Sequence, residues 1–474
     1  MEMRLARPVT GILCLLWLIA ATPTLVESDA YRYALGIVYL ITFYVYCMTP
    51  ERPRTTWLAW LCIGWGFYAA ARFAAMYFFS PDHQLGASEW LYIFPVFFPM
   101  LGFGFSLTFS QIEKMLAAFF AVALVFLLVM TPYATVLAGE AITPLIQHNR
   151  IHGAVSCGLM TIGAFFWLRY YLRSGTRSQF ARFAVFAAPL VMILCLFNIY
   201  GSKSKGVWLA MVAVLPILAL FVLNKSKRKA AAIAVGSAAL VLGAGVYAAR
   251  TNLYETAGPT IVAAAPLLEG TAEGNDVDAL VSTAIDSPDT PTSMGERLQL
   301  WSNAWEVFSA SPIFGAGNQW LSRWHQTRYA KVKYTLLHNG YFEILVRHGL
   351  FGAAIFSIML YGFFLSVWRA SQKQLIAQEA FYAYGICILF FAITILSNSN
   401  NRLAIGESLA LISSAFACYC NQRLDALRFG QKKPSAQILD LQSKPGDFSA
   451  AVASSKGQSH LVEADENAAM GHST

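Results

Sequence analysis

The chain has 474 residues, of which 57% are apolar and only 13% are charged, and its mean hydropathy is +0.51. Soluble globular domains are about 45–50% apolar and about 25% charged, so an ordinary soluble protein is excluded. The same composition excludes a disordered chain, a fibrous repeat and a disulfide scaffold. The formal net charge of +8 does not indicate a nucleic-acid partner, because positive side chains in a membrane protein first set its orientation.

Apolar windows long enough to cross a bilayer recur along the chain and predict an all-α polytopic membrane protein with about 12 transmembrane helices. The first window is predicted to be a retained helix rather than a signal peptide, because it is as long as a full span. The predicted spans are 8–26, 33–49, 57–79, 91–109, 115–138, 153–171, 183–200, 206–223, 230–248, 347–368, 379–397 and 404–420.

Positive side chains collect on alternate connections between these spans. Fifteen lysines and arginines lie on the side of the N-terminus, and the basic residues after the last span would join them. The short connections on the other side hold five, which are Arg32, Arg150, Lys203, Lys205 and Arg402. By the positive-inside rule both termini are predicted to be cytoplasmic, which requires an even number of spans.

The predicted organisation is nine spans in 1–249, an external loop domain in 250–346, three spans in 347–420 and a disordered cytoplasmic tail in 421–474. In the loop, 251–292 is rich in Ala, Gly, Thr and Pro and is predicted to be a loosely packed excursion. Two short amphipathic helices are predicted after it, over Gly295–Ser311 and Leu336–His348, the second ending at Gly349.

Each short helix is predicted to present one face. The first face holds Arg297, Trp301, Ala304, Trp305 and Phe308, and the second holds His338, Tyr341, Phe342 and Leu345. Both faces are typical of helices that lie along the outer rim of the membrane.

Six polar side chains on the predicted external side are not needed for orientation. They are Arg150, Lys203, Lys205, Arg297, His338 and Arg402. Converging guanidinium and ammonium groups are suited to bind a phosphate or diphosphate. Each has an alternative interpretation: a lone cation can contact a lipid head group, and a histidine at a helix start can cap or pack. Arg72 lies within a predicted span and either bonds backbone carbonyls or belongs to the same pocket.

Several kinds of chemistry lack their motifs. A Walker loop is absent, which argues against an ATP-driven pump, and no Cys/His cluster has metal-ligand spacing. The Asp276-x-Asp278 pair lies in an acidic, low-complexity stretch and is interpreted as solvated charge. The predicted cytoplasmic connections are too short for a nucleotide-sugar domain. An external reaction therefore needs a donor that is already activated in the membrane, and a lipid-linked diphosphate fits.

Four segments then match a known family. Residues 336–352, which read Leu-Leu-His-Asn-Gly-Tyr-Phe-Glu-Ile-Leu-Val-Arg-His-Gly-Leu-Phe-Gly, resemble the His-Asn signature of the O-antigen ligase and polymerase superfamily. The stretch from Arg297 through Pro312 to Gly315-x-Gly317 is similar to a second family segment. Ser202–Gly206 resembles a third, with lysine where the family has arginine, and Arg150-x-x-Gly153 resembles a fourth.

This resemblance implies a C-type, metal-independent glycosyltransferase of the bacterial inner membrane with a periplasmic active site and no cofactor. It would move O-antigen polysaccharide from undecaprenyl diphosphate to a sugar hydroxyl of lipid A–core, with inversion. His338 would be the general base, and Arg297 would act with Arg150, Lys203 and Lys205 on the diphosphate. Asn339 and Arg402 complete the predicted substrate-binding set, and membrane lipids are the other expected partners.

Three alternatives remain at this stage. An O-antigen polymerase would share the donor and the fold class. A transporter for lipid-linked oligosaccharides would place its polar groups near the middle of the bilayer on broken spans. A purely structural membrane protein would leave the external cations without a role. The long external loop with its late His338 segment favours the ligase.

Overall fold

The computed structural model describes residues 6–50, 52–79, 83–223, 247, 250–332 and 336–429. Within these ranges the chain is helical almost throughout and forms no strand. A single isolated bridge pairs Val26 with Ile146, so it ties the connection after the first helix to the segment before Arg150. The prediction of an all-α polytopic membrane protein is therefore confirmed.

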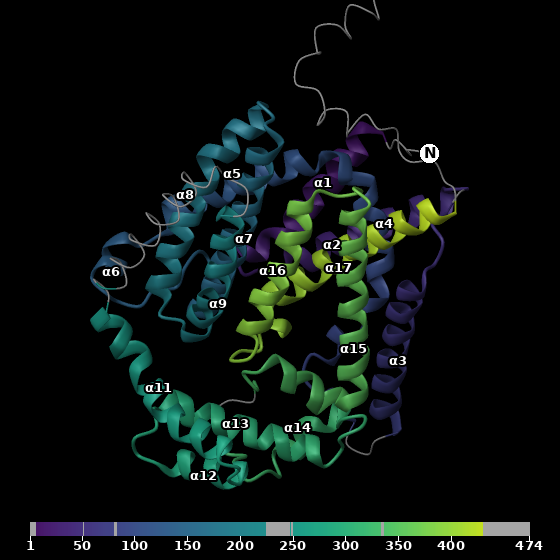
Figure 1. The fold of residues 1–474 in the computed structure, drawn as a ribbon. Helices are drawn as coiled ribbons and strands as arrows, with labels where there is room; N and C mark the ends of the chain where they lie inside the picture. The colour runs from purple at the N-terminus through teal and green to yellow at the C-terminus, as the bar shows by residue number, and fades with distance from the viewer. Residues whose placement is uncertain are drawn as a thin grey trace, which may run out of the picture.

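The long helices form two packed groups that lie side by side (Figure 1). The first group is α1 (Arg7–Ala21), α2 (Ala30–Met48), α3 (Trp57–Phe79), α4 (Phe98–Thr108), α15 (Gly340–Gln372) and α17 (Ala404–Arg428). The second group is α5 (Ile112–Met130), the short α6 (Tyr133–Leu137), α7 (Arg150–Ser174), α8 (Gln179–Ser202), α9 (Lys205–Leu223) and α16 (Gln378–Thr394). Each group has its own apolar core, because an apolar helix face has to be buried against another helix.

Short 3₁₀ helices connect or extend these elements. They are η1 (Thr22–Thr24), η2 (Glu89–Phe97), η3 (Phe109–Gln111), η4 (Gly317–Gln319) and η5 (Asn400–Arg402). η2 contains Pro95, whose ring and missing N–H disfavour a regular α-helix there. The first half of the predicted span 91–109 is therefore a 3₁₀ segment packed on α3.

α7 is the central helix of its group. Of its most apolar window, 72% is buried inside the structure, whereas the other candidate spans bury about a third of theirs. It packs against α8, α16 and α9. Arg150 at its first turn is consequently attached to the most enclosed of the candidate spans.

The eight candidate spans by length and hydropathy agree with the predicted windows. One of them, Glu89–Met130, covers both predicted spans 91–109 and 115–138. α16 is a shorter apolar helix, and α17 is not among the candidates although it covers the predicted span 404–420. The window 230–248 lies outside the described residues, apart from the single residue 247. The count of twelve spans therefore stays a prediction.

The connection between α9 and α15 forms a separate helical layer under the ends of both groups (Figure 1). The layer consists of α11 (Arg250–Ala272), α12 (Val277–Asp286), α13 (Thr292–Ser309) and α14 (Trp320–Trp324). The stretch 251–292, predicted as a loose excursion, is largely helical, although α12 buries no side chain. These two helices pack mainly on each other and on α13, so the structure adds helix to the predicted excursion without contradicting its loose packing.

α13 and α14 enclose a small core of their own, made of Leu300, Ala304, Val307, Ala316, Trp320, Trp324, Leu337 and Val346. The first short helix was predicted correctly, and its predicted face is only partly the buried one. Ala304 and Phe308 are buried as expected, whereas the Trp305 side chain is 48% exposed. The buried positions 300, 304 and 307 have helical spacing and lie on a face rotated from the predicted one.

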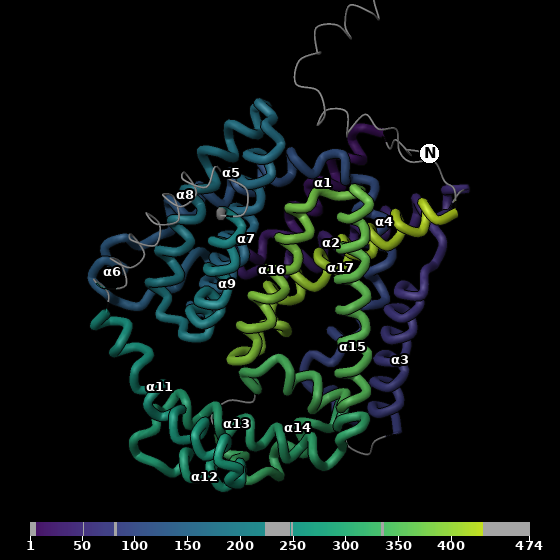
Figure 2. Tube along the Cα trace, in the orientation of Figure 1, coloured from purple at the N-terminus to yellow at the C-terminus, as the bar shows by residue number. Residues whose placement is uncertain are grey.

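The second short helix is the first part of α15, which begins at Gly340 rather than at Leu336. Gly349 interrupts it with φ 61° and ψ −160°, as the sequence predicts, and a long apolar helix follows beside α3 (Figure 2). His338 precedes the helix, so the predicted helical face shared with Tyr341, Phe342 and Leu345 is wrong.

The start of α1 and the last described turn of α17 lie at the end of the bundle opposite to α11–α14 (Figure 1). α17 continues to Arg428, so 421–428 is helical rather than disordered. The rest of the predicted tail, from 430 onward, lies outside the described residues.

Candidate active site

Two lysines lie at the turn between α8 and α9, where the bundle meets the helical layer of α11–α14. Lys203 ends α8 in a left-handed conformation, with φ 51°. Lys205 begins α9, and its Nζ donates a hydrogen bond of 2.6 Å to Oγ1 of Thr260 in α11. The positive charges of Arg297 and Arg150 both act on the Lys205 ammonium. Three segments far apart in sequence thus bring cations together here.

A carboxylate fixes the start of α7, where Arg150 lies. Oε2 of Glu27 accepts a hydrogen bond of 2.9 Å from the backbone N–H of His148 and lies 3.0 Å from Nδ1 of His152. Burial alone would raise the pKa of Glu27, but these two hydrogen bonds outweigh it and lower the pKa. The Arg150 side chain is exposed and has no ion pair or hydrogen bond with the part of the chain that the structure describes.

Arg297 lies in the second turn of α13 and is half-buried. Its guanidinium forms no ion pair or hydrogen bond with the described residues, and burial lowers its pKa. An arginine nevertheless stays charged at neutral pH. A partly desolvated guanidinium without a partner is costly on its own, so it is suited to an anionic ligand.

His338 forms a left-handed turn residue with φ 49° directly before α15. A non-glycine residue in this conformation costs of order 1 kcal/mol or more, so neighbouring bonds have to hold it. Burial lowers the pKa of His338, and the charge of Arg297 lowers it further, while Glu343 and Glu296 act in the opposite direction. Its imidazole is therefore neutral at pH 7 and able to accept a proton.

Asn339 caps α15. Its Oδ1 accepts hydrogen bonds from the backbone N–H groups of Tyr341 at 2.9 Å and Phe342 at 3.2 Å. Its Nδ2 donates to the carbonyl of Leu396 at 3.1 Å. This amide, predicted to bind substrate, is engaged in holding the turn that presents His338.

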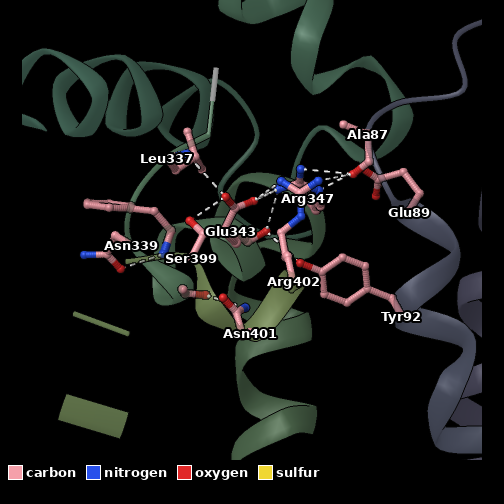
Figure 3. A network of polar contacts seen from close by, with 12 residues as sticks. Ala87, Glu89, Tyr92, Leu337, Asn339, Glu343, Arg347, Ser399, Asn401 and Arg402 are labelled. Atoms are coloured by element: carbon pink, nitrogen blue, oxygen red, sulfur yellow. Dashed lines mark hydrogen bonds and ion pairs between the residues drawn. The ribbon is translucent and has the colours of Figure 1, made fainter. Parts of the chain in front are cut away.

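A buried ion network, which we define as Glu89, Glu343, Arg347 and Arg402, lies next to the His338 turn (Figure 3). The Leu337 N–H joins the turn to the network by a hydrogen bond to Glu343. Arg347 pairs with Glu343 and, at 2.7 Å, with Glu89, and its guanidinium lies over the Trp320 ring. Arg402 donates to Glu343 at 2.8 Å. Two carboxylates and two guanidinium groups make this network neutral, so it can lie in the interior.

The sequence predicts Arg402 to be an external cation that binds phosphate. The structure instead buries it in this network. Its side chain is only 8% exposed, and its Nη2 donates to the carbonyl of Ala87 at 2.6 Å in addition to the pair with Glu343. The sequence could not reveal this, because the partners lie 59 and 315 positions away.

Arg72 bonds backbone carbonyls, which is the first of the two roles predicted for it. It donates to the carbonyls of Arg347 and Gly315, both at 3.0 Å, and lies 3.3 Å from Nδ1 of His348. Gly315 has φ 70°, and a Cβ there would lie 2.5 Å from the Arg347 carbonyl carbon, which only glycine avoids. Arg72 thus ties α3 to the loop layer and to the kinked helix α15.

Sequence reasoning missed Glu27, Glu89 and Glu343, because acidic residues were weighed only as metal or nucleotide ligands. Glu343 carried a usable signal: it stands four residues before Arg347 on a predicted helix, which is ion-pair spacing. Glu89 carried none. No group of three or more His, Cys, Asp or Glu side chains is placed to hold a metal ion among the described residues.

A comparison against protein families matches part of the chain. Residues 190–357 match the family model described as O-antigen ligase. This segment of the chain is therefore similar to O-antigen ligases. No curated protein matches the sequence. The matched segment runs from within α8 into α15, so it includes Lys203, Lys205, Arg297 and His338.

O-antigen ligase superfamily members are glycosyltransferase-like enzymes, ligases or polymerases, which act on lipid-linked polysaccharides at membranes. Within the family segment, α9 carries Lys205, α13 carries Arg297, and the turn before α15 carries His338. Arg150, Glu89 and Arg402 lie outside it, so the bundle on either side of the matched segment contributes to the same region.

Proposed function

We propose that this protein is an O-antigen ligase that transfers polysaccharide from undecaprenyl diphosphate to a sugar hydroxyl of lipid A–core. The observation that supports this most is the unpaired, half-buried guanidinium of Arg297. Its charge acts both on Lys205 and on His338. A base and a set of cations within electrostatic reach of one another fit an acceptor hydroxyl beside a leaving diphosphate.

We define the outer cations as Arg150, Lys203, Lys205 and Arg297. In the proposed reaction they bind the two phosphates of the donor and stabilise the negative charge that grows on them. Arginine supplies bidentate contacts and lysine a mobile point charge. This arrangement replaces a divalent metal ion, so the reaction is proposed to be metal-independent.

The proposed chemical step is a single displacement. The oxygen of the acceptor hydroxyl attacks the anomeric carbon of the donor sugar, and its proton passes to the His338 imidazole. The bond from the anomeric carbon to the diphosphate oxygen breaks, and its electron pair leaves with undecaprenyl diphosphate. One displacement inverts the configuration at that carbon, which NMR of the product linkage would establish.

A polymerase of the same superfamily is the second candidate, since it uses the same donor and adds the glycan to another glycan. The long layer 250–332, which carries Arg297, and the His338 turn that follows it favour the ligase. A transporter of lipid-linked oligosaccharide is less consistent with cations that lie at helix ends. Lys203, Lys205 and Arg150 all stand at the first or last turn of a helix.

The topology proposed with this function places the site on the periplasmic face of the inner membrane and both termini in the cytoplasm. The opposite placement of the helical layer and the two described chain ends supports it (Figure 1). Cysteine substitutions at exposed positions in α12 and in the α2–α3 connection, labelled from outside intact spheroplasts, test the assignment.

The lipopolysaccharide profile of a strain lacking the gene tests the function itself. A ligase predicts polymerised glycan that accumulates on its lipid carrier while lipid A–core stays bare. A polymerase predicts core that carries a single repeat unit, and this result would contradict the proposal. Complementation with the intact gene is the control for both outcomes.

A further inference from the structure

The Glu343 side chain reaches back from α15 to the backbone that carries His338. Its Oε1 accepts a hydrogen bond of 3.3 Å from the Leu337 N–H, one residue before His338. The same oxygen accepts 2.8 Å from Oγ of Ser399. The carboxylate thus joins the His338 turn to the segment before η5 (Figure 3).

The other carboxylate oxygen of Glu343 is held by Arg347 and Arg402. The side chain is fully buried, and the guanidinium groups leave it little freedom to move. Tyr92 adds a hydrogen bond of 3.2 Å to the backbone carbonyl of Glu343. An ionised carboxylate with four side-chain or backbone donors is a rigid acceptor.

The backbone on the other side of His338 is anchored independently. Asn339 caps α15, and the Gly340 N–H donates to the carbonyl of Ile395 at 2.8 Å. Fixed points at Leu337 and Gly340 therefore bracket a left-handed residue. Without the Leu337 anchor, His338 could relax toward the right-handed or extended conformations that non-glycine residues prefer.

We propose that Glu343, supported by Arg347, Arg402 and Ser399, is a positioning residue that holds the His338 imidazole in place for proton transfer. This inference rests on the proposed role of His338 as the general base. Glu343 touches neither substrate in this proposal and acts only through the turn and through its charge.

Charge gives Glu343 a second effect on His338. The charged groups whose fields act on His338 are Arg297 and Glu296 from α13 and Glu343 from α15. Without the negative charge of Glu343, the positive charge of Arg297 acts on His338 with less compensation. One carboxylate then remains in the network for the guanidinium groups of Arg347 and Arg402. The pKa of His338 would then fall further, and the acidic limb of the pH–rate profile would move to lower pH.

The decisive experiment is steady-state transfer by purified Glu343→Gln protein, measured across about pH 5 to 9. The amide is similar in size but carries no charge and offers one acceptor oxygen for both Leu337 and Ser399. We expect kcat to fall roughly tenfold to hundredfold, as misplacement of a catalytic group does, with KM for the donor nearly unchanged. The acidic limb should shift to lower pH.

Glu296→Gln is the matched control. It removes the other carboxylate whose charge acts on His338, but Glu296 forms no hydrogen bond with the turn in the described structure. We expect the same direction of pH shift with kcat at the optimum almost unchanged. Equal kcat values for the two variants would overturn the positioning role.

Loss of a buried charge can also unfold the protein, so a charge-balanced variant is needed. Glu343→Gln combined with Arg402→Gln removes one anion and one cation and leaves the Glu89–Arg347 pair. A folded double variant with full kcat would overturn the inference, whereas low kcat at normal thermal stability supports it. His338→Ala is measured in parallel: if it stays active, the proposed function of His338 fails, whatever Glu343 does.

Discussion

The candidate site contains two sets of positive side chains, and they have opposite surroundings. Among the outer cations, Arg150, Lys203 and Arg297 have no ion pair or hydrogen bond with the described residues, and Lys205 bonds only the Thr260 hydroxyl. The guanidinium groups of the buried ion network, Arg347 and Arg402, share two carboxylates and further backbone acceptors.

We interpret this difference as two roles, ligand binding by one set of cations and support of the His338 turn by the other. A buried pair is neutral, and removing one member leaves a desolvated charge, so the network stabilises one geometry of the side chains that it joins. The charges of Arg297 and Arg150 both repel the Lys205 ammonium, and a bound anion would relieve this repulsion. We therefore assign ligand binding to the unpaired set and the shape of the His338 turn to the paired set.

The largest effect is expected for His338→Ala. Loss of a general base lowers turnover by about 10²–10⁴-fold, while the outer cations still bind the donor. Transfer rate and donor affinity, measured on the same purified sample, check this. Normal ligation in cells at wild-type protein level would contradict the assignment of the base.

Arg297→Ala should follow, with a loss of roughly 10²–10³-fold in turnover, because a charge that stabilises the leaving diphosphate is removed. Arg297→Lys should restore part of the activity, since it restores charge but not bidentate geometry. Thermal stability should stay near wild type, because no pair is broken. Unchanged donor use with a lowered Tm would instead indicate a packing role.

Arg402→Ala tests the buried ion network. It leaves Glu343 with one guanidinium instead of two, and breaking a buried pair costs about 3–5 kcal/mol. We expect a clear fall in Tm and in protein level, with a smaller change in turnover per folded molecule than Arg297→Ala causes. A wild-type Tm with lost donor affinity would return Arg402 to the substrate-binding set.

Chelation is expected to have the smallest effect. If the outer cations supply the positive charge that the diphosphate needs, transfer in EDTA should equal transfer in its absence. The check is the initial rate of the purified enzyme before and after exhaustive chelation. Inactivation by EDTA, with rescue by a divalent ion, would show that the cations alone are insufficient.

The sequence alone was sufficient for the features that depend on local hydropathy and spacing. Span-length apolar windows predicted the long helices, and Pro312 and Gly349 predicted where the short helices of the loop end. The superfamily was recognised from the His338 segment, because that motif is contiguous. The outer cations were found because orientation in the membrane did not explain them.

Tertiary structure decided the charge pairs whose partners are far apart in sequence. Arg402 and Arg150 looked equivalent in sequence, yet one lies between Glu343 and the Ala87 carbonyl and the other is exposed. Asn339 proved to be a helix cap, and Arg72 a donor to carbonyls 243 and 275 positions away. Hydropathy is a property of a short window, whereas the pairing of a buried charge depends on which distant segments the fold brings into contact.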